Sequence, residues 1–392
     1  MFFIALFKNI LSKKNSSFLL VGISFFRIFA SLIMFLKKVT VVNYKNISSK
    51  TLEFSATINC FVGNNGAGKT NLLDAIYHLG MGKSYFSPSA VQNIRHDEDF
   101  YLIDGFFESN SREEQIVCSL KKGQKKMMKH NGKAYERLSD HIGKYPMVII
   151  SPADRDLIVE GSETRRKFLD SVIAQTDREY LELLIRYNRV LLQRNTLLKQ
   201  MAESGISAFD TLQVYDAQLA PLGQFIYEKR REFMEGFAPV FSYQYAYIAG
   251  GQEEVKVVYE SILHEQTQEA LLAQHQQRDL QAQYTTAGIH KDDLRLEIQG
   301  YPIKKYGSQG QQKSLLIALK LSQFELLKRT LGITPIVLLD DIFDKLDDTR
   351  VAQLVQLVTQ NHFGQLFITD THSQRTEEVV KMTGLPYQMI LF

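Results

Sequence analysis

Hydrophobic and polar positions divide this chain into segments with two different periods. Alternation typical of β-strands runs through residues 35–44 and 52–62, and we expect a polar turn at 46–50 to join them. Apolar residues spaced three and four apart, typical of helices, extend from about residue 164 to residue 249. The pattern predicts an α/β core interrupted by a helical block, with strand-like runs before the block at 100–150 and after it at 293–299, 333–341 and 365–370.

This change of period also predicts a division into domains. The core comes in two parts, and a Gln- and Glu-rich helix near 265–282 closes the insert between them. We expect a separate N-terminal extension, the first core part, an inserted helical arm and the second core part at residues 1–33, 34–163, 164–284 and 285–392.

The N-terminal extension is rich in Phe, Leu and Ile. Residues 17–36 approach the ~20 residues needed to span a bilayer. Arg27 lies inside that stretch, where a charge costs roughly 2.5–3.5 kcal/mol, and no small-residue cleavage site follows. Since a strand-like pattern begins immediately afterwards, we expect Met34 to be the true start and residues 1–33 to be non-native.

Composition excludes two classes of protein. A hydrophobic content of 45% over 392 residues is too high for a disordered chain. Cys60 and Cys118 are the only cysteines, which excludes a disulfide scaffold and favours a reducing, cytoplasmic location. The net charge of +3 is too small to indicate nucleic-acid binding, so that case depends on local patches.

One glycine-rich segment matches the G-x-x-x-x-G-K-[ST] phosphate loop, with an apolar strand before it and an amphipathic helix after it. Such loops turn backbone N–H groups towards phosphates at a helix N-terminus. We expect ATP as the ligand, with Lys69 at its β- and γ-phosphates and the Thr70 hydroxyl on Mg²⁺. The loop consists of Gly63, Asn64, Asn65, Gly66, Ala67, Gly68, Lys69 and Thr70.

A second candidate is the apolar run 336–339, which ends in Asp340 and Asp341. Acids at the carboxyl end of a buried parallel strand face the crevice where ligands bind. We expect Asp340 to hold Mg²⁺ through water and Asp341 to orient or deprotonate the attacking water. The alternative is a strand end that merely carries two acids.

A third segment, Tyr306-Gly-Ser-Gln-Gly-Gln-Gln, precedes a predicted helix. Ser308 could simply be its N-cap. The segment also resembles the signature loop of ABC-type ATPases, which implies that Ser308, Gly310 and Gln311 contact ATP. The same resemblance places residues 344–347 at the D-loop and makes His372 the switch histidine.

Longer stretches resemble the RecF family of recombination mediators, which is related to SMC proteins. The match covers nearly all of 34–380, including FVGNNGAGKTNLLDAIYHLGMGKSYF, SPADRDLIVEGSETRRKFLD, YGSQGQQKSLLIALKLSQ and VLLDDIFDKLDDTR. It implies an ABC-type P-loop ATPase head with an inserted arm and a weak, DNA-stimulated ATPase serving as a switch. It also implies an ATP-dependent homodimer that works with RecO and RecR in DNA repair and replication-fork maintenance, loading RecA at single-stranded gaps.

Three features depart from the family pattern. Residues 1–33 have no counterpart, and no Q-loop glutamine can be chosen, because residues 151–154 occupy its place. Position 341 is Asp where transporters have Glu; the family favours Asp, and a shorter arm suits slow hydrolysis.

The DNA contacts would come from a basic hairpin and from the start of the helical block. Phosphate-backbone binding needs a local density of charge but no sequence-reading groove. The alternative is a solvated hairpin face. The candidates are Lys121, Lys122, Lys125, Lys126, Lys129, Arg165 and Arg166.

Two rival functions remain. An ABC transporter ATPase subunit would need a surface that docks a membrane partner, and we expect no such partner. A small-molecule P-loop phosphotransferase would lack the combination of Ser308 and His372.

Overall fold

The computed structural model describes residues 32–109, 111–205, 208–251, 253–341 and 363–392. Within these residues, a parallel sheet of five strands forms the centre of the nucleotide-binding core, in the order β15-β3-β14-β13-β8. Near-continuous burial of its inner strands is typical of a parallel sheet covered on both faces. The strands are β3 (Ile58–Val62), β8 (Met147–Ile150), β13 (Ile336–Asp340), β14 (Leu366–Asp370) and β15 (Tyr387–Leu391).

A second, largely antiparallel sheet lies on the other side of helix α3 (Lys69–Met81). Apolar side chains of α3 pack into one core cluster with residues from both sheets. This helix is therefore fixed on two sides. The strands of the second sheet are β1 (Leu32–Tyr44), β2 (Ile47–Glu53), β4 (Phe100–Ser109), β5 (Arg112–Lys121), β6 (Met127–His130), β7 (Lys133–Ala134) and β12 (Ile333–Thr334).

The prediction of a turn at residues 46–50 is wrong in its position. Residues 47–50 belong to strand β2, and the turn consists of Lys45 and Asn46. The predicted strand 52–62 is also divided, since it contributes to β2 in one sheet and to β3 in the other.

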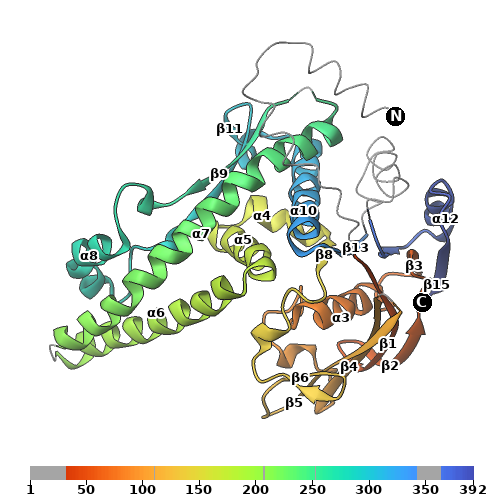
Figure 1. The fold of residues 1–392 in the computed structure, drawn as a ribbon, viewed down its shortest axis with the longest axis horizontal. Helices are drawn as coiled ribbons and strands as arrows, with labels where there is room; N and C mark the ends of the chain where they lie inside the picture. Colours follow the sequence, from red (N-terminus) through yellow and green to blue (C-terminus); the bar gives the residue numbers. More distant parts are fainter. Residues whose placement is uncertain (1–31, 110, 206–207, 252, 342–362) are drawn as a thin grey trace. The chain divides into compact units, whose positions relative to one another are not determined.

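The helical arm is formed mainly by two long helices, α6 (Arg178–Ser204) and α7 (Phe209–Ala249), which run side by side in Figure 1. Two buried arginines tie the arm together: Arg194 pairs with Asp216 and Asp279, and Arg230 with Asp170 and Asp292. Further α-helices in the described residues are α5 (Ser162–Thr176), α8 (Gln268–Ala282), α10 (Gln309–Leu331), which packs on α7, and α12 (Ser373–Lys381). Two single helical turns are α4 (Asp156–Val159) and α9 (Ile303–Tyr306).

Observed elements or strand pairings cross all three expected boundaries, and helix α5, which begins at Ser162, crosses the one between residues 163 and 164. The range 164–284 contains strand β9 (Val255–Glu260), which pairs with β10 (Asp293–Ile298) beyond residue 284. A short strand, β11 (Tyr301–Pro302), completes that sheet. Strand β1 begins at Leu32, and its first two residues pair with β12. Among the helices of the described residues, none is long and apolar enough to span a membrane.

Candidate nucleotide site

The phosphate loop connects the end of β3 to the start of α3. Gly63, Gly66 and Gly68 have φ values of 155°, 81° and 102°, a region that favours glycine. At Gly63 an added Cβ would also lie 2.6 Å from the carbonyl oxygen of Phe392. The side chain of Asn46 donates to the carbonyl oxygen of Gly66 at 3.0 Å, so the turn between β1 and β2 braces the loop. Sequence reasoning missed Asn46.

Lys69 is the buried cation of this loop, with 4% of its surface exposed. Its ammonium group donates to the carbonyl oxygens of Gly63 at 2.8 Å and Asn64 at 2.9 Å. The charge is therefore held inside the curve of the loop. Asn64, Asn65, Gly66 and Ala67 are exposed above it. This arrangement presents a positive charge and a helix N-terminus to an incoming anion.

Asp340 brings the end of β13 to the phosphate loop. Its Oδ1 accepts hydrogen bonds from the hydroxyls of Thr70 and Thr369, both at 2.8 Å. Its Oδ2 accepts from the hydroxyl of Ser151 at 3.2 Å. The structure thus brings together the phosphate loop and the acidic end of β13. It adds Ser151 and Thr369, to which the sequence analysis had given no role.

The hydroxyl oxygen of Thr70 and the carboxylate oxygens of Asp340 fit Mg²⁺ as ligands. Hydroxyl and carboxylate oxygens are hard ligands, and Mg²⁺ is usually held by one or two carboxylates together with substrate phosphates rather than by a complete protein cage. The described residues contain no cluster of three or more His, Cys, Asp or Glu side chains suited to a metal. Thr70 and Asp340 would hold the ion jointly with the nucleotide.

Asp341 and His372 follow neighbouring parallel strands, so both lie at the same edge of the sheet. Asp341 has a φ of 45°, and its backbone N–H donates to the Thr369 hydroxyl at 3.0 Å. His372 is exposed at the start of α12, and its N–H donates to Oδ1 of Asp370 at 3.1 Å. That buried carboxylate also accepts from Thr376 at 2.7 Å, which fixes the segment carrying the histidine.

The segment at the Q-loop position forms a short 3-10 helix, Pro152–Arg155. Its Asp154 accepts from the Ser151 N–H at 2.8 Å and pairs with Lys320 of α10 at 2.7 Å. Tyr85 donates to the same carboxylate. Sequence analysis missed Lys320, whose signal was a single lysine within the apolar helical run LLIALKLSQF.

Ser308 is the N-cap of α10, as the simpler interpretation predicted. Its hydroxyl accepts from the Gln311 N–H at 3.2 Å, and its own N–H donates to the Gln311 side chain at 2.7 Å. Ser308 is nevertheless exposed, so the cap leaves this helix N-terminus open to an outside group. A pocket of about 480 Å³ joins the start of α10 to Asp340 and Asp341 and is also lined by Arg155 and Lys313. Residues 344–347, the expected D-loop, lie outside the described residues.

The expected DNA contacts divide into two groups. Lys121, Lys122 and Lys125 are exposed around the β5–β6 hairpin, and Lys129 is half-buried. Lys126 differs from these lysines, because it turns inward and donates to the Gly82 carbonyl oxygen. Burial lowers the pKa of its ammonium group.

The arginines of the patch also need correction. Arg165 makes paired hydrogen bonds to the Asp293 carboxylate at 2.7 and 2.9 Å and further bonds to the carbonyl oxygens of Leu157 and Glu160. Arg166 donates to the Asp292 carbonyl oxygen at 2.6 Å. Arg165 ties α5 to β10 and Arg166 ties it to Asp292, the residue before that strand, and we do not retain them as DNA contacts.

Comparison with known proteins identifies the family. The family model described as "RecF/RecN/SMC N terminal domain" matches residues 35–389. The chain is 59% identical over 356 residues to "DNA replication and repair protein RecF" of Flavobacterium johnsoniae, covering 91% of this chain and 99% of that protein. It is 47% identical to the protein of the same name from Bacteroides fragilis, covering 91% of this chain and 96% of the relative.

Solved structures agree with this. The structure described as the recombination mediator protein RecF with ATP, in the RecFOR pathway, matches with a TM-score of 0.81 and 31% identity, covering 89% of this chain and 95% of that one. An Smc head domain derived from Pyrococcus furiosus matches with a TM-score of 0.51 at 16% identity, covering 90% and 92% of the two chains, which shows the fold alone. The chain belongs to the RecF family of DNA replication and repair proteins, with an α/β ATPase head of the ABC and SMC type.

Proposed function

We propose that this protein is an ATP-driven DNA clamp that acts as a recombination mediator at single-stranded gaps. In this proposal it works in the cytoplasm with RecO and RecR to load RecA, and slow, DNA-stimulated ATP hydrolysis resets it. The observation that carries the proposal is the meeting of Lys69, Thr70 and Asp340 at the edge of the parallel sheet.

Each residue has a role that follows from its position. Lys69 would leave the loop carbonyls to neutralise the β- and γ-phosphates. Thr70 and Asp340 would hold Mg²⁺, which supplies charge neutralisation on the phosphate oxygens. Asp341 would orient the attacking water, and His372, at the neighbouring strand end, would contact the γ-phosphate side.

The exposed N-terminus of α10 supports the proposed dimerisation. Ser308 and the N–H groups after it would approach ATP held by a second subunit, so that two heads enclose each nucleotide. The capping box between Ser308 and Gln311 holds this end in place before the partner arrives. ATP binding then closes the dimer, and hydrolysis opens it.

The exposed lysines of the β5–β6 hairpin would contact the DNA backbone. Lys121, Lys122 and Lys125 offer charge without base-reading geometry, so we expect DNA binding that depends on salt and only weakly on sequence. The relatives named for DNA replication and repair support DNA as the partner. Their similarity over 91% of the chain favours this function over that of a transporter ATPase subunit.

The test is DNA affinity in three nucleotide states. Fluorescence anisotropy would compare gapped, single-stranded and duplex DNA with ATP, with ADP and without nucleotide. We expect ATP to tighten binding, most strongly on gapped DNA, and the Lys69→Ala variant to show no such response. Equal DNA affinity in all three states would contradict an ATP-driven clamp.

A further inference from the structure

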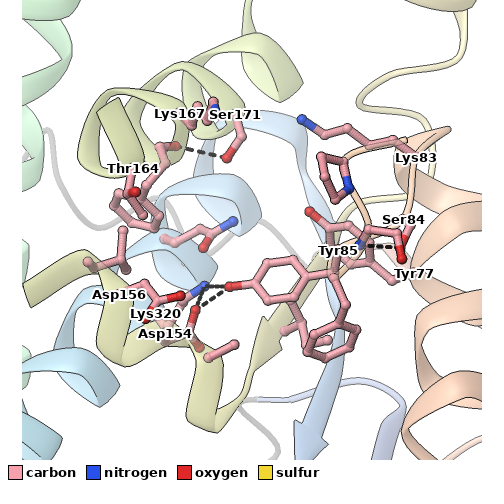
Figure 2. A pocket seen from close by; sticks show the side chains of 18 residues that line it. Tyr77, Lys83, Ser84, Tyr85, Asp154, Asp156, Thr164, Lys167, Ser171 and Lys320 are labelled. Carbon is pink, nitrogen blue, oxygen red and sulfur yellow. Dashed lines mark hydrogen bonds and ion pairs between the residues drawn. The ribbon is translucent and has the colours of Figure 1, made fainter. Parts of the chain in front are cut away.

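A second pocket, of about 510 Å³, lies apart from the phosphate loop. No residue of 63–70 lines it. It is enclosed by the segment after α3, by the 3-10 helix at the Q-loop position and by helices α5 and α10 (Figure 2). Its volume is in the range of ligand pockets for small molecules. Neither the phosphate-loop chemistry nor the lysines of the β5–β6 hairpin account for it.

Two lysines face each other across one side of this pocket. Figure 2 shows Lys83 extending from the segment after α3 towards α5, where Lys167 and Ser171 lie. The two ammonium groups repel one another: although Lys83 is exposed, partial desolvation and then the charge of Lys167 lower its pKa. Two like charges brought together in this way favour an anion between them.

The acidic groups nearby do not satisfy these cations. Asp170, which attracts Lys83, is itself held by Arg230 and by Tyr180. Glu163 pairs with Lys167 at 2.7 Å, but both side chains are more than two-thirds exposed, and such pairs are weak. Within the part of the chain that the structure describes, no hydrogen bond or ion pair holds the ammonium group of Lys83.

Part of the remaining wall is aromatic. Tyr77, Tyr85, Phe86 and Phe168 line the pocket, together with the buried Lys320–Asp154 pair, the carboxylate of Asp156 and several small polar and aliphatic residues. Figure 2 shows the Tyr85 hydroxyl directed at that pair. Because Lys320 and Asp154 carry opposite charges, the pair is neutral as a whole. The pocket therefore combines a place for an anion with a surface for a flat, largely apolar ring.

We propose that this pocket binds a phosphate-bearing nucleotide unit, with its phosphate between Lys83 and Lys167 and its base against the aromatic wall. The unit could come from a free nucleotide or from a DNA strand. The DNA form rests on the proposed function above, whereas the free-nucleotide form does not. Either way, the site excludes the phosphate loop, although Asp154 lines both this pocket and the one beside Asp340.

The experiment removes the two cations and leaves the ATP site intact. Lys83→Ala/Lys167→Ala would be compared with wild type and with Lys199→Ala/Lys256→Ala, a control of two exposed lysines outside the pocket. A non-hydrolysable ATP analogue would first saturate the phosphate loop. Equilibrium dialysis would then measure the binding of deoxyadenosine monophosphate, a short oligonucleotide and inorganic phosphate.

We expect the double variant to bind at least one nucleotide probe roughly tenfold or more weakly, because it lacks two charged hydrogen-bond donors. Lys83→Arg/Lys167→Arg should retain binding, and affinity for the ATP analogue should be unchanged. Weaker binding of the monophosphate identifies a free nucleotide as the ligand. Weaker binding of the oligonucleotide alone identifies DNA.

Three results would overturn the proposal: unchanged binding of both nucleotide probes in the double variant, no binding of either probe to wild type, or inorganic phosphate binding as tightly as the monophosphate. These results are separable from a failure of the clamp. The clamp is tested by ATP-dependent DNA affinity and by the Lys121, Lys122 and Lys125 hairpin, none of which lines this pocket.

Discussion

The hydroxyl of Ser151 donates to Oδ2 of Asp340 at 3.2 Å, immediately beyond the paired residues Ile150 and Leu339 of two neighbouring parallel strands. The backbone N–H of Ser151 donates a hydrogen bond to the Asp154 carboxylate, and Asp154 forms an ion pair with Lys320 in the middle of α10. A continuous set of side chains therefore connects the proposed Mg²⁺ site with the helix that begins at Ser308.

Removing the positive charge of Lys320 should lower the free energy of unfolding. Lys320→Met leaves the Asp154 carboxylate, 1% exposed as a side chain, without its counter-charge, and losing one partner of a buried pair costs roughly 3–5 kcal/mol. Urea unfolding would measure the free energy. Arg329→Met, which breaks an exposed pair on the same helix, should cost less than about 1 kcal/mol. Equal costs for the two variants would show that the Lys320 pair contributes no more to stability than an exposed pair.

The phosphate loop is tested at Lys69. Lys69→Ala removes the buried charge and should abolish ATP binding, as measured by calorimetry. Lys69→Arg should keep ATP binding but lose hydrolysis, because a bulkier fork replaces a compact ammonium group. Lys199→Ala, at an exposed position on α6, serves as the control. An Ala variant with unchanged ATP affinity would exclude this loop as the ATP site.

Dimerisation is tested by two variants with opposite effects. Ser308→Arg introduces a bulky cation at the exposed start of α10 and should prevent ATP-dependent dimers while leaving ATP binding by the monomer nearly intact. Asp341→Asn should preserve the ATP dimer and slow its hydrolysis and release. Light scattering in ATP and Mg²⁺ gives the mass of each.

Ser308→Ala controls for removal of the cap, which is worth about 1 kcal/mol, without the added bulk. It should still dimerise. Persistence of ATP dimers in the Ser308→Arg protein, or their absence in the unmodified protein, would rule out a nucleotide enclosed between two heads.

The DNA patch is tested through salt. Replacing Lys121, Lys122 and Lys125 by Ala should weaken binding to all sequences alike and reduce the slope of log affinity against log salt by about 0.9 for each phosphate that is no longer neutralised. Replacing three exposed lysines elsewhere, at 199, 256 and 381, should leave the slope unchanged. An unaltered slope in the hairpin variant would make the patch a solvated surface.

Stability should depend on pH through His141. Burial lowers its pKa to about 4, and its Nε2 donates to the Leu79 carbonyl oxygen at 2.6 Å. Its ordinary pKa is about 6.5, so between these values the unfolded chain binds the extra proton and the folded one does not. The contribution of neutral His141 to the free energy of unfolding is complete above about pH 6.5 and falls by roughly 3 kcal/mol as pH drops to about 4.

His141→Gln keeps a donor for the Leu79 carbonyl oxygen but cannot take up a proton. Its unfolding free energy, measured by urea titration at pH 7 and pH 4, should fall less than that of wild type. His96→Gln changes an exposed side chain, 94% accessible, and should follow wild type. If the His141→Gln protein lost as much stability as wild type on acidification, protonation of this histidine would have no part in it.

Sequence reasoning succeeded where a signal is contiguous. In the β3–loop–α3 unit, the glycines, the lysine, the strand pattern before them and the helix pattern after them all lie within one stretch of sequence. Each of these signals therefore supports the same prediction. It failed at β2, where Ser48, Ser49 and Lys50 suggested a turn. They belong to a strand in which every residue after Ile47 is exposed or half-buried, and polarity alone does not separate such a strand from a loop.

The charged residues show the other limit. Arg165 looked like a free cation because its partner, Asp293, is supplied by a strand that follows the whole arm. Lys320 and Asp154 are likewise brought together only by folding. Local patterns indicate which residues are charged, but the pairing of distant charges depends on tertiary contacts that those patterns do not contain.

Strand β3 lies between β14 and β15, and this order has a consequence for protein synthesis. Residues 63–70 leave the ribosome early, whereas both neighbours of β3 come from residues 366–370 and 387–391. Until those residues are made, the strand that positions the loop has no partner on either side, and the Gly63 N–H lacks the Asp370 carbonyl oxygen that accepts from it at 3.4 Å. A nascent chain that ends within the arm thus carries the whole motif but no folded ATP site, and nucleotide binding begins only when translation of the head is nearly finished.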